Sequence, residues 1–331
     1  MARVTIDDLA ARLGLSRASV SYALNGRPGV GDETRMRVTA LAAELGWQPS
    51  VSARSLSRRR ADAYGIVLNR QPEDLGSEPY YMGLLSGIES ALSETGVSLM
   101  IRFVADQDSE AAVYRTWNAE GRVDGVLLTD LRTDDPRPAL LDELTLTYLV
   151  HGGRRAADGW NFDQATDAAT LVDHLAELGH RRIVHISGPP DLLHETERRR
   201  AVREIGGRRG MEVITVQGDY TFDGSRELTG SLLEDRRRPT AIIYSNDLMA
   251  VGGSIALRSA TEPIAVLSWD DSLLCRTASP SITALQRDPY GAGRFSAERL
   301  IKLVEEDDHS ELLPRSRSAL IIRESSLRQT P

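Results

Sequence analysis

The first residues whose types and spacing suggest chemistry lie between positions 5 and 25, in two short segments of helical apolar periodicity separated by a glycine. Thr5 and Ser16 each precede one segment and are typical N-cap residues, so the spacing predicts two helices joined by a turn. Such a pair, with small and polar residues at the exposed start of the second helix, is typical of a helix-turn-helix that enters the DNA major groove. The side chains expected to face the bases are Arg17, Ala18 and Tyr22. An ordinary pair of packed helices is the alternative interpretation.

A second group of polar side chains follows two apolar runs near the C-terminal end of the chain. Asn246 follows the run 241–245, and Asp270 follows the run 264–268. An amide and a carboxylate together can bind sugar hydroxyls, because each hydroxyl offers one donor and two acceptors. Each residue also has a structural interpretation, since Asn246 suits the N-cap of the next helix and Asp270 suits a turn.

The elements that would position these two groups differ in kind. In the N-terminal part, a third helix is expected over 32–45, with Met36, Val38, Leu41, Ala42 and Leu45 on its buried side and Gly46 at its end. The basic segment 50–60 that follows is too short to be a stable helix alone, so we interpret it as a linker or as a segment that orders against a partner.

From residue 63 onward the pattern alternates between strands and helices. Strands are expected at 64–68, 98–104, 125–129, 147–150, 182–187, 212–216, 241–245 and 264–268, with helices such as 81–95, 165–178, 197–209 and 247–259 between them. This alternation predicts parallel sheets with helices on both faces. Two similar halves predict two lobes, with a cleft where the C-terminal ends of their strands face each other.

Composition excludes several classes of protein. The chain has 331 residues, 41% of them hydrophobic, and no run of eighteen apolar residues or apolar signal region, so we expect no membrane segment. Its one cysteine, Cys275, allows no internal disulfide and fits a cytoplasmic location. The GxSxG, HExxH and GxxxxGK[ST] motifs are absent, and we see no metal-ligand cluster. We therefore expect no enzyme, no cofactor and no metal.

Charge is distributed unevenly along the chain. Residues 1–60 hold ten arginines against five acidic residues, a balance of +5, which leaves −13 for the other 271 residues because the total is −8. A basic N-terminal segment on an acidic body is typical of a DNA-reading module attached to a domain that does not bind DNA.

The N-terminal residues also match a known pattern. The stretches VTIDDLA (4–10), GLS (14–16), SVS (19–21), LNG (24–26), TR (34–35), LGWQP (45–49) and ARSL (53–56) resemble the DNA-binding headpiece and hinge of the LacI/GalR family of bacterial repressors. Further matches at NFDQ (161–164), LGHRRI (178–183) and ISGP (186–189) extend the resemblance over nearly the whole chain.

The resemblance implies a DNA-contacting set. In the family the hinge folds on DNA and a leucine enters the minor groove at the operator centre, a position that Leu56 matches here; inserting it at a flexible CpG step would kink the duplex. The alternative for Leu56 is packing on its own domain. Tyr22 stands where the family commonly has arginine, so the usual contact to guanine is missing. The expected DNA-binding residues are Thr5, Ser16, Arg17, Ala18, Ser19, Ser21, Tyr22, Asn25, Thr34, Ala53, Arg54 and Leu56.

The resemblance also implies an effector site between the lobes. Arg198 matches an effector-clamping arginine whose planar fork can bridge two hydroxyls, and Tyr220 matches an aromatic position that packs on a sugar face. Arg198 also lies in an arginine run that could form a solvated helix face. His194 is expected on a loop, and His151 and His185 are interpreted as structural. The expected effector-binding residues are Tyr81, His194, Arg198, Tyr220, Asn246, Asp270 and Arg287.

Together these features predict a small all-α helix-turn-helix headpiece (1–49), a hinge (50–61) and an α/β two-lobed periplasmic-binding-protein-like domain (62–331). The lobes are expected to comprise roughly 62–160 with 288–318, and 161–287 with 319–331. We expect a repressor that binds a near-palindromic operator with a central CpG and is controlled by a saccharide effector. The tail has no leucine heptads, which favours a homodimer. A purine or nucleoside effector, or a solute-binding protein without a DNA role, are the alternatives.

Overall fold

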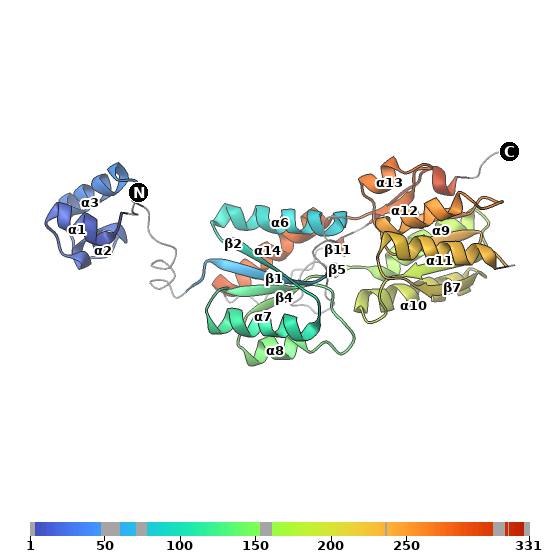
Figure 1. The fold of residues 1–331 in the computed structure, drawn as a ribbon, viewed down its shortest axis with the longest axis horizontal. Coiled ribbons are helices and arrows are strands. Elements are labelled where there is room, and N and C mark those ends of the chain that lie inside the picture. Colours follow the sequence, from blue (N-terminus) through green and yellow to red (C-terminus); the bar gives the residue numbers. More distant parts are fainter. Residues whose placement is uncertain are drawn as a thin grey trace. The chain divides into compact units, whose positions relative to one another are not determined.

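The structure, a computed structural model, describes residues 4–47, 60–70, 78–152, 161–235, 237–306, 315–316 and 318–327. The chain divides into two compact units, residues 1–60 and 61–331 (Figure 1). Of the residues expected to bind DNA, Ala53, Arg54 and Leu56 lie outside the described residues.

The first unit contains the helices α1 (Ile6–Leu13), α2 (Arg17–Leu24) and α3 (Asp32–Glu44). Both expected N-caps are present. Thr5 forms a capping box with Asp8, in which each side chain accepts a hydrogen bond from the other residue's backbone N–H. The Ser16 side chain accepts from the backbone N–H of Ser19. Gly14 ends α1 with a φ of +65°, a left-handed conformation that glycine adopts without strain.

One apolar core holds the three helices together. Its buried residues come from all three: Leu9, Ala10, Val20, Ala23, Val38 and Ala42. The expectation that Met36 is buried was wrong, because its residue is 67% exposed. Val38, Leu41, Ala42 and Leu45 follow helical spacing, and Met36 lies two positions before Val38, on the opposite side of the helix.

The first lobe of the second unit is a parallel sheet in the order β2-β1-β3-β4. The strands are β1 (Ala63–Asn69), β2 (Ser98–Val104), β3 (Gly125–Leu128) and β4 (Tyr148–Val150). Side chains of β1 alternate between two cores: Ile66 packs on the side of α6 (Pro79–Thr95) and α14 (Pro289–Glu306). Val67 packs on the side of α7 (Gln107–Ala119) and α8 (Arg137–Glu143), so helices cover both faces (Figure 1).

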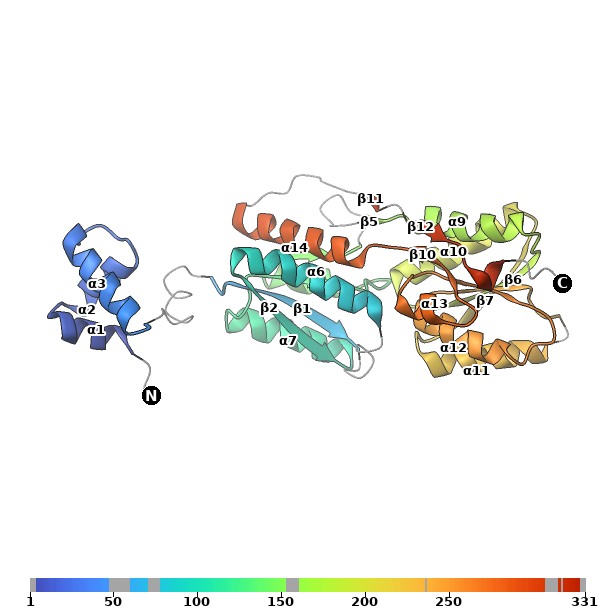
Figure 2. The same cartoon turned by 90° about the horizontal axis from the view of Figure 1, so that it is seen from above.

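The helices α6 and α14 are far apart in sequence and lie side by side (Figure 2). Glycines allow their close approach. A Cβ atom on Gly87 would lie 2.0 Å from the carbonyl oxygen of Tyr290, and one on Gly293 would lie 2.1 Å from that of Leu84. The contact anchors α14, which comes late in the chain, in the first lobe.

The second lobe is a sheet in the order β12-β10-β9-β8-β6-β7. Its strands are β6 (Arg182–Ser187), β7 (Glu212–Gln217), β8 (Ala241–Tyr244), β9 (Ala265–Ser268), β10 (Thr283–Gln286) and β12 (Ala319–Ile321), of which β12 is antiparallel to β10. One core joins the sheet to α9 (Gln164–Glu177) and α10 (Leu193–Arg208). A second core lies toward α11 (Phe222–Glu234), α12 (Asp247–Leu257) and α13 (Leu273–Thr277).

The chain passes between the lobes after β4, after β10 and after α14. Near these passages the short strands β5 (Asn161–Phe162) and β11 (Arg315–Ser316) pair in parallel, and a 3-10 turn (Glu324–Ser326) packs beside β9 and β10. The expected strands are all present, with their ends within one residue of the predicted ones. Among the described residues, no helix combines the length and apolar character needed to cross a membrane.

Candidate functional site

The first unit presents the start of α2 on its surface. Arg17 and Ala18 are exposed there, as is the Ser16 that caps the helix, whereas Ser19 and Ser21 are half-buried. The Arg17 side chain is 72% exposed and lies 3.5 Å from the Asp7 carboxylate. A guanidinium so exposed is held only weakly by such a pair and is free to reach a base edge or a phosphate.

The remaining expected DNA contacts lie around the same helix and the start of α3. Tyr22 is 41% exposed, and Asn25 is exposed while its Nδ2 donates to the carbonyl oxygen of Ser21 at 2.8 Å. Thr5 is exposed at the start of α1, and Thr34 is half-buried in the first turn of α3. The surface therefore offers mostly polar side chains together with the aromatic ring of Tyr22. Because position 22 is a tyrosine, no arginine is present there to make a bidentate contact with guanine.

All seven residues expected to bind an effector line one pocket in the second unit. The pocket draws residues from both lobes. Its lining is Arg70, Glu78, Tyr80, Tyr81, Leu84, Thr129, Asp130, Leu131, His151, Gly152, Phe162, Gln164, Leu193, His194, Glu197, Arg198, Tyr220, Ser245, Asn246, Asp247, Asp270 and Arg287. Most of these residues follow the C-terminal ends of parallel strands, where ligands of such sheets bind.

An ion-paired group forms the first-lobe wall. Arg70 follows β1 and donates from Nη2 to Asp130 Oδ2 at 2.9 Å, while its Nε lies 3.3 Å from Glu78 Oε2. Tyr81 donates its hydroxyl proton to the same Asp130 oxygen in a short hydrogen bond. Burial alone would raise the pKa of Asp130, but Arg70 and the other neighbours outweigh burial and lower it. Asp130 is therefore ionised and paired at neutral pH.

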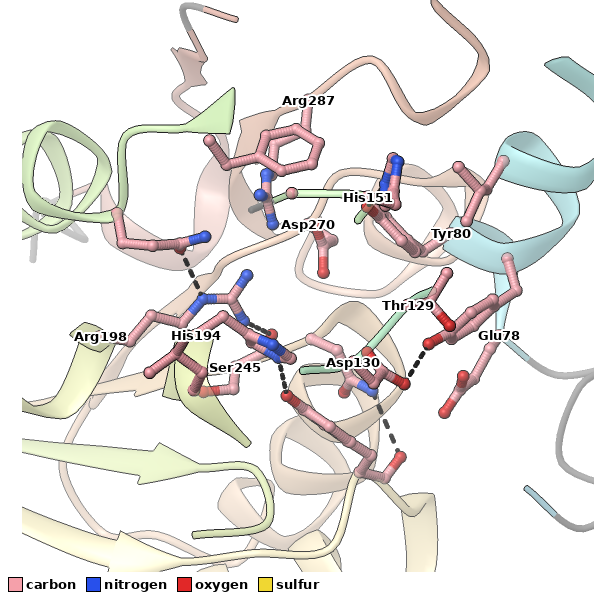
Figure 3. A pocket seen from close by; sticks show the side chains of 18 of the residues that line it. Glu78, Tyr80, Thr129, Asp130, His151, His194, Arg198, Ser245, Asp270 and Arg287 are labelled. Carbon is pink, nitrogen blue, oxygen red and sulfur yellow. Dashed lines mark hydrogen bonds and ion pairs between the residues drawn. The ribbon is translucent and has the colours of Figure 1, made fainter. Parts of the chain in front are cut away.

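Arg198 lies on the opposite wall, and two of its guanidinium nitrogens, Nε and Nη1, donate hydrogen bonds within the protein. Its Nε donates to Gln164 Oε1 at 2.9 Å, and Nη1 donates to Glu195 Oε1 at 2.8 Å and to the carbonyl oxygen of Ser245 at 3.1 Å. The guanidinium stacks over Trp269 at 4.7 Å. Within the described part of the chain Nη2 has no hydrogen-bond partner, and Figure 3 shows this side chain facing the pocket.

Arg287 and Asp270 close the pocket near the passages between the lobes. Arg287 Nη1 lies 3.4 Å from Asp270 Oδ1, and its guanidinium lies 3.9 Å from the ring centroid of Phe162. Figure 3 shows both groups in the same part of the pocket as Tyr80 and His151. The second Asp270 oxygen has no hydrogen-bond partner among the described residues, so it is available to accept from a ligand.

His194 and Tyr220 form a hydrogen-bonded pair. His194 Nε2 lies 2.8 Å from the Tyr220 hydroxyl oxygen, which in turn donates to Glu195 Oε1 at 2.8 Å. Burial lowers the pKa of His194 to about 4, helped by the nearby Arg198. Burial and Glu195 raise the pKa of Tyr220 well above its usual value. Both side chains are therefore uncharged at neutral pH.

Asn246 combines a place on the pocket wall with a structural role. Its Oδ1 caps α12 by accepting from the backbone N–H of Met249 at 2.8 Å, and its Nδ2 donates to the carbonyl oxygen of Tyr220 at 3.3 Å. Beside it, burial raises the pKa of Asp247 to about 6, with Asp270 adding to the effect. One amide proton of Asn246 remains for a ligand.

Sequence reasoning missed much of the first-lobe wall. Arg70, Tyr80 and Asp130 were not expected, although Arg70 and Asp130 directly follow strands and could have been found by that rule. His151 was interpreted as structural, yet it lines the pocket, and its Nε2 lies 3.0 Å from the Tyr80 hydroxyl. His185, which was also interpreted as structural, is fully buried and does not line the pocket. His194 was expected on a loop, but α10 begins at Leu193, four residues before the predicted start.

Two parts of the chain match families of known proteins. Residues 5–50 match the family described as bacterial regulatory proteins, lacI family, and residues 172–326 match the periplasmic binding protein-like domain. The HTH-type transcriptional regulator CelR of Thermobifida fusca is 31% identical over 336 residues, which cover 98% of each chain. The chain belongs to the LacI family. The resemblance and fold class expected from the sequence are thereby confirmed.

Other LacI-family proteins are similar over comparable lengths. The ribose operon repressor of Escherichia coli K12 is 28% identical and covers 90% of this chain and 92% of its own. A structure described as a CelR–cellobiose complex has a TM-score of 0.73 at 30% identity, covering 98% of this chain and all of that one. A lac repressor dimer bound to operator, at 22% identity and a TM-score of 0.85 over 98% of this chain and all of that one, shares the fold. The chain is thus a LacI-family regulator with a DNA-binding domain.

Proposed function

We propose that this LacI-family protein is a homodimeric repressor whose affinity for a near-palindromic operator falls when a neutral saccharide binds between its lobes. The observation that carries the proposal is that all seven residues expected to bind an effector line one pocket. A relative that aligns over nearly the whole chain has been solved with cellobiose, which supports a saccharide. The proposal includes no catalytic step.

The chemistry of the pocket favours a polyhydroxy ligand. The pocket is lined by carboxylates and amides, which can hydrogen-bond to sugar hydroxyls, and by aromatic rings, which can pack against the apolar faces of a sugar. A purine or nucleoside is the second candidate, because arginine, aspartate and an aromatic ring also suit a nucleobase. However, the Arg287 guanidinium covers one face of Phe162 at 3.9 Å, so that face is not open to a stacked base.

Control of DNA binding follows from linkage. A ligand that favours a closed arrangement of the lobes weakens operator binding only if operator-bound protein disfavours that arrangement. The operator must then weaken ligand binding by the same factor. In the proposed mechanism the hinge, which includes Leu56, carries this coupling.

The test combines two measurements on the full-length protein. A duplex selected from a random pool is titrated by fluorescence anisotropy, and a thermal-shift panel of cellobiose, other saccharides and nucleosides identifies the effector. We expect sequence preference over random competitor and a saccharide that both raises the melting temperature and weakens operator binding. Absence of any duplex preference would refute the repressor function, and stabilisation by nucleosides alone would replace the saccharide.

A further inference from the structure

Glu195, in the first turn of α10, is a fully buried carboxylate that accepts four hydrogen bonds. Oε1 accepts from Arg198 Nη1 and from the Tyr220 hydroxyl, both at 2.8 Å. Oε2 accepts from the backbone N–H of Gly188 at 2.8 Å and from the Ser245 hydroxyl at 2.9 Å. Every one of these four groups donates its proton, so only an ionised carboxylate satisfies the arrangement.

The network fixes the proton on two histidines. Because the Tyr220 hydroxyl donates to Glu195, its oxygen must accept from His194 Nε2–H. In the same way the Ser245 hydroxyl donates to Glu195 and accepts from His185 Nε2, which lies 3.1 Å away. Both rings are neutral, since burial lowers the pKa of each to about 4. His194 therefore keeps Nδ1 as an unprotonated acceptor in a residue that lines the pocket.

Glu195 also cancels a charge at the pocket. Arg198 is 4% exposed and reaches the pocket with Nη2, and Glu195 is its ion-pair partner. The other two arginines of the pocket are matched in the same way, Arg70 with Asp130 at 2.9 Å and Arg287 with Asp270 at 3.4 Å. A phosphate or sulfate brought to Arg198 would meet the field of the Glu195 carboxylate as well as the arginine.

We propose that Glu195 is a positioning and specificity-determining residue of this pocket. It orients Arg198 and Tyr220 for hydroxyl binding and neutralises Arg198, so that the pocket takes uncharged polyhydroxy ligands and rejects their phosphorylated or sulfated analogues. The inference rests on the proposed effector function of the pocket. It adds the residue that sets the charge of the ligand, although Glu195 itself lies behind the residues that line the site.

The replacement Glu195→Gln tests the charge. An amide has one acceptor oxygen and would point its NH2 group at two donors, while Arg198 would lose its counter-charge. We expect Glu195→Gln to bind inorganic sulfate at least about tenfold more tightly than the wild type by calorimetry at constant ionic strength. We expect cellobiose, or the panel saccharide that binds in its place, to bind about ten- to a hundredfold more weakly, and Glu195→Asp to restore part of that affinity without binding sulfate.

Glu110→Gln is the matched control. Glu110 is also a buried glutamate that pairs with an arginine, Arg137 at 2.8 Å, and accepts from a tyrosine hydroxyl, that of Tyr114, but neither of these partners lines the pocket. We expect Glu110→Gln to lose about as much stability as Glu195→Gln but to bind sulfate and saccharide as the wild type does. Equal changes in both variants would mean that Glu195 serves only the fold and would overturn the proposal.

Two further results separate this inference from the proposed function. If the wild type binds a panel saccharide and Glu195→Gln binds it equally well, the role of Glu195 is wrong and the effector function stands. If no saccharide binds but Glu195→Gln gains sulfate binding, the role of Glu195 in setting the pocket charge holds and the proposed effector function fails.

If Glu195→Gln does not fold, nitrogen NMR of the wild type tests the hydrogen-bond network. The network requires His194 to carry its proton on Nε2 at pH 7, and a proton on Nδ1 would overturn the proposal.

Discussion

Replacing Arg198 by methionine should break the buried ion pair that supports the pocket while keeping much of the side-chain volume. The variant leaves Glu195 buried without its cation, and removing one partner of a buried pair costs about 3–5 kcal/mol of unfolding free energy. The pKa of Glu195 supports a cost of this order, although it reflects all of its neighbours together. The pKa of Glu195 is lowered from 4.5 to about 2, because Arg198 and the other neighbours outweigh burial, which corresponds to about 3 kcal/mol of stabilisation at neutral pH.

The pH dependence gives the prediction its sign. A carboxylate whose pKa is lower in the folded state stabilises the protein fully above its unfolded pKa, and this stabilisation is lost as the pH falls toward the folded value. In the wild type the Glu195 contribution is therefore lost between about pH 4.5 and 2. In Arg198→Met, burial without the arginine raises the pKa of Glu195. Protonation of Glu195 at lower pH then removes the cost of burying an unpaired charge in this variant. The difference between the two proteins should shrink from pH 7 to pH 4.

Urea unfolding followed by tryptophan fluorescence measures this difference, since Trp269 stacks against the Arg198 guanidinium. Arg200→Met, an exposed position on the same helix, is the control and should change stability by less than about 0.5 kcal/mol. If Arg198→Met is no less stable than Arg200→Met, or if its deficit does not depend on pH, the Arg198–Glu195 pair does not hold this wall together.

Three further predictions concern binding. Arg17→Ala should cost about 1–3 kcal/mol at one half-site position when single-base operator variants are compared by anisotropy; a uniform loss across sequences would instead make Arg17 a phosphate contact. Leu56→Ala should weaken specific operator binding and spare nonspecific binding, and equal losses on both duplexes would argue against insertion into the minor groove. Asp270→Ala should abolish the effector response of operator binding while DNA affinity persists; induction that survives this change would place the effector elsewhere.

Local sequence signals determined the N-terminal unit well. The N-caps at Thr5 and Ser16 depend on a few neighbouring residues, so their hydrogen bonds follow from composition and spacing alone. Strand positions in both lobes were equally readable, because buried parallel strands are short apolar runs. The failure at Met36 shows the limit of reading apolar residues without their phase around the helix.

The sequence by itself also indicated which side chains follow strands, and these side chains meet because parallel strands end at one edge of a sheet. Only the tertiary structure decided how they are paired. Glu195 lies in the charged run HETERRR, where nothing local distinguishes a solvated glutamate from a buried one. Its burial depends on the start of α10, on the nearby backbone N–H of Gly188, and on donors from Tyr220 and Ser245, which are distant in sequence. The Glu195–Arg198 pair lies within one helix, but the pairs Arg70–Asp130 and Arg287–Asp270 join segments that are distant in sequence, and no local pattern encodes them.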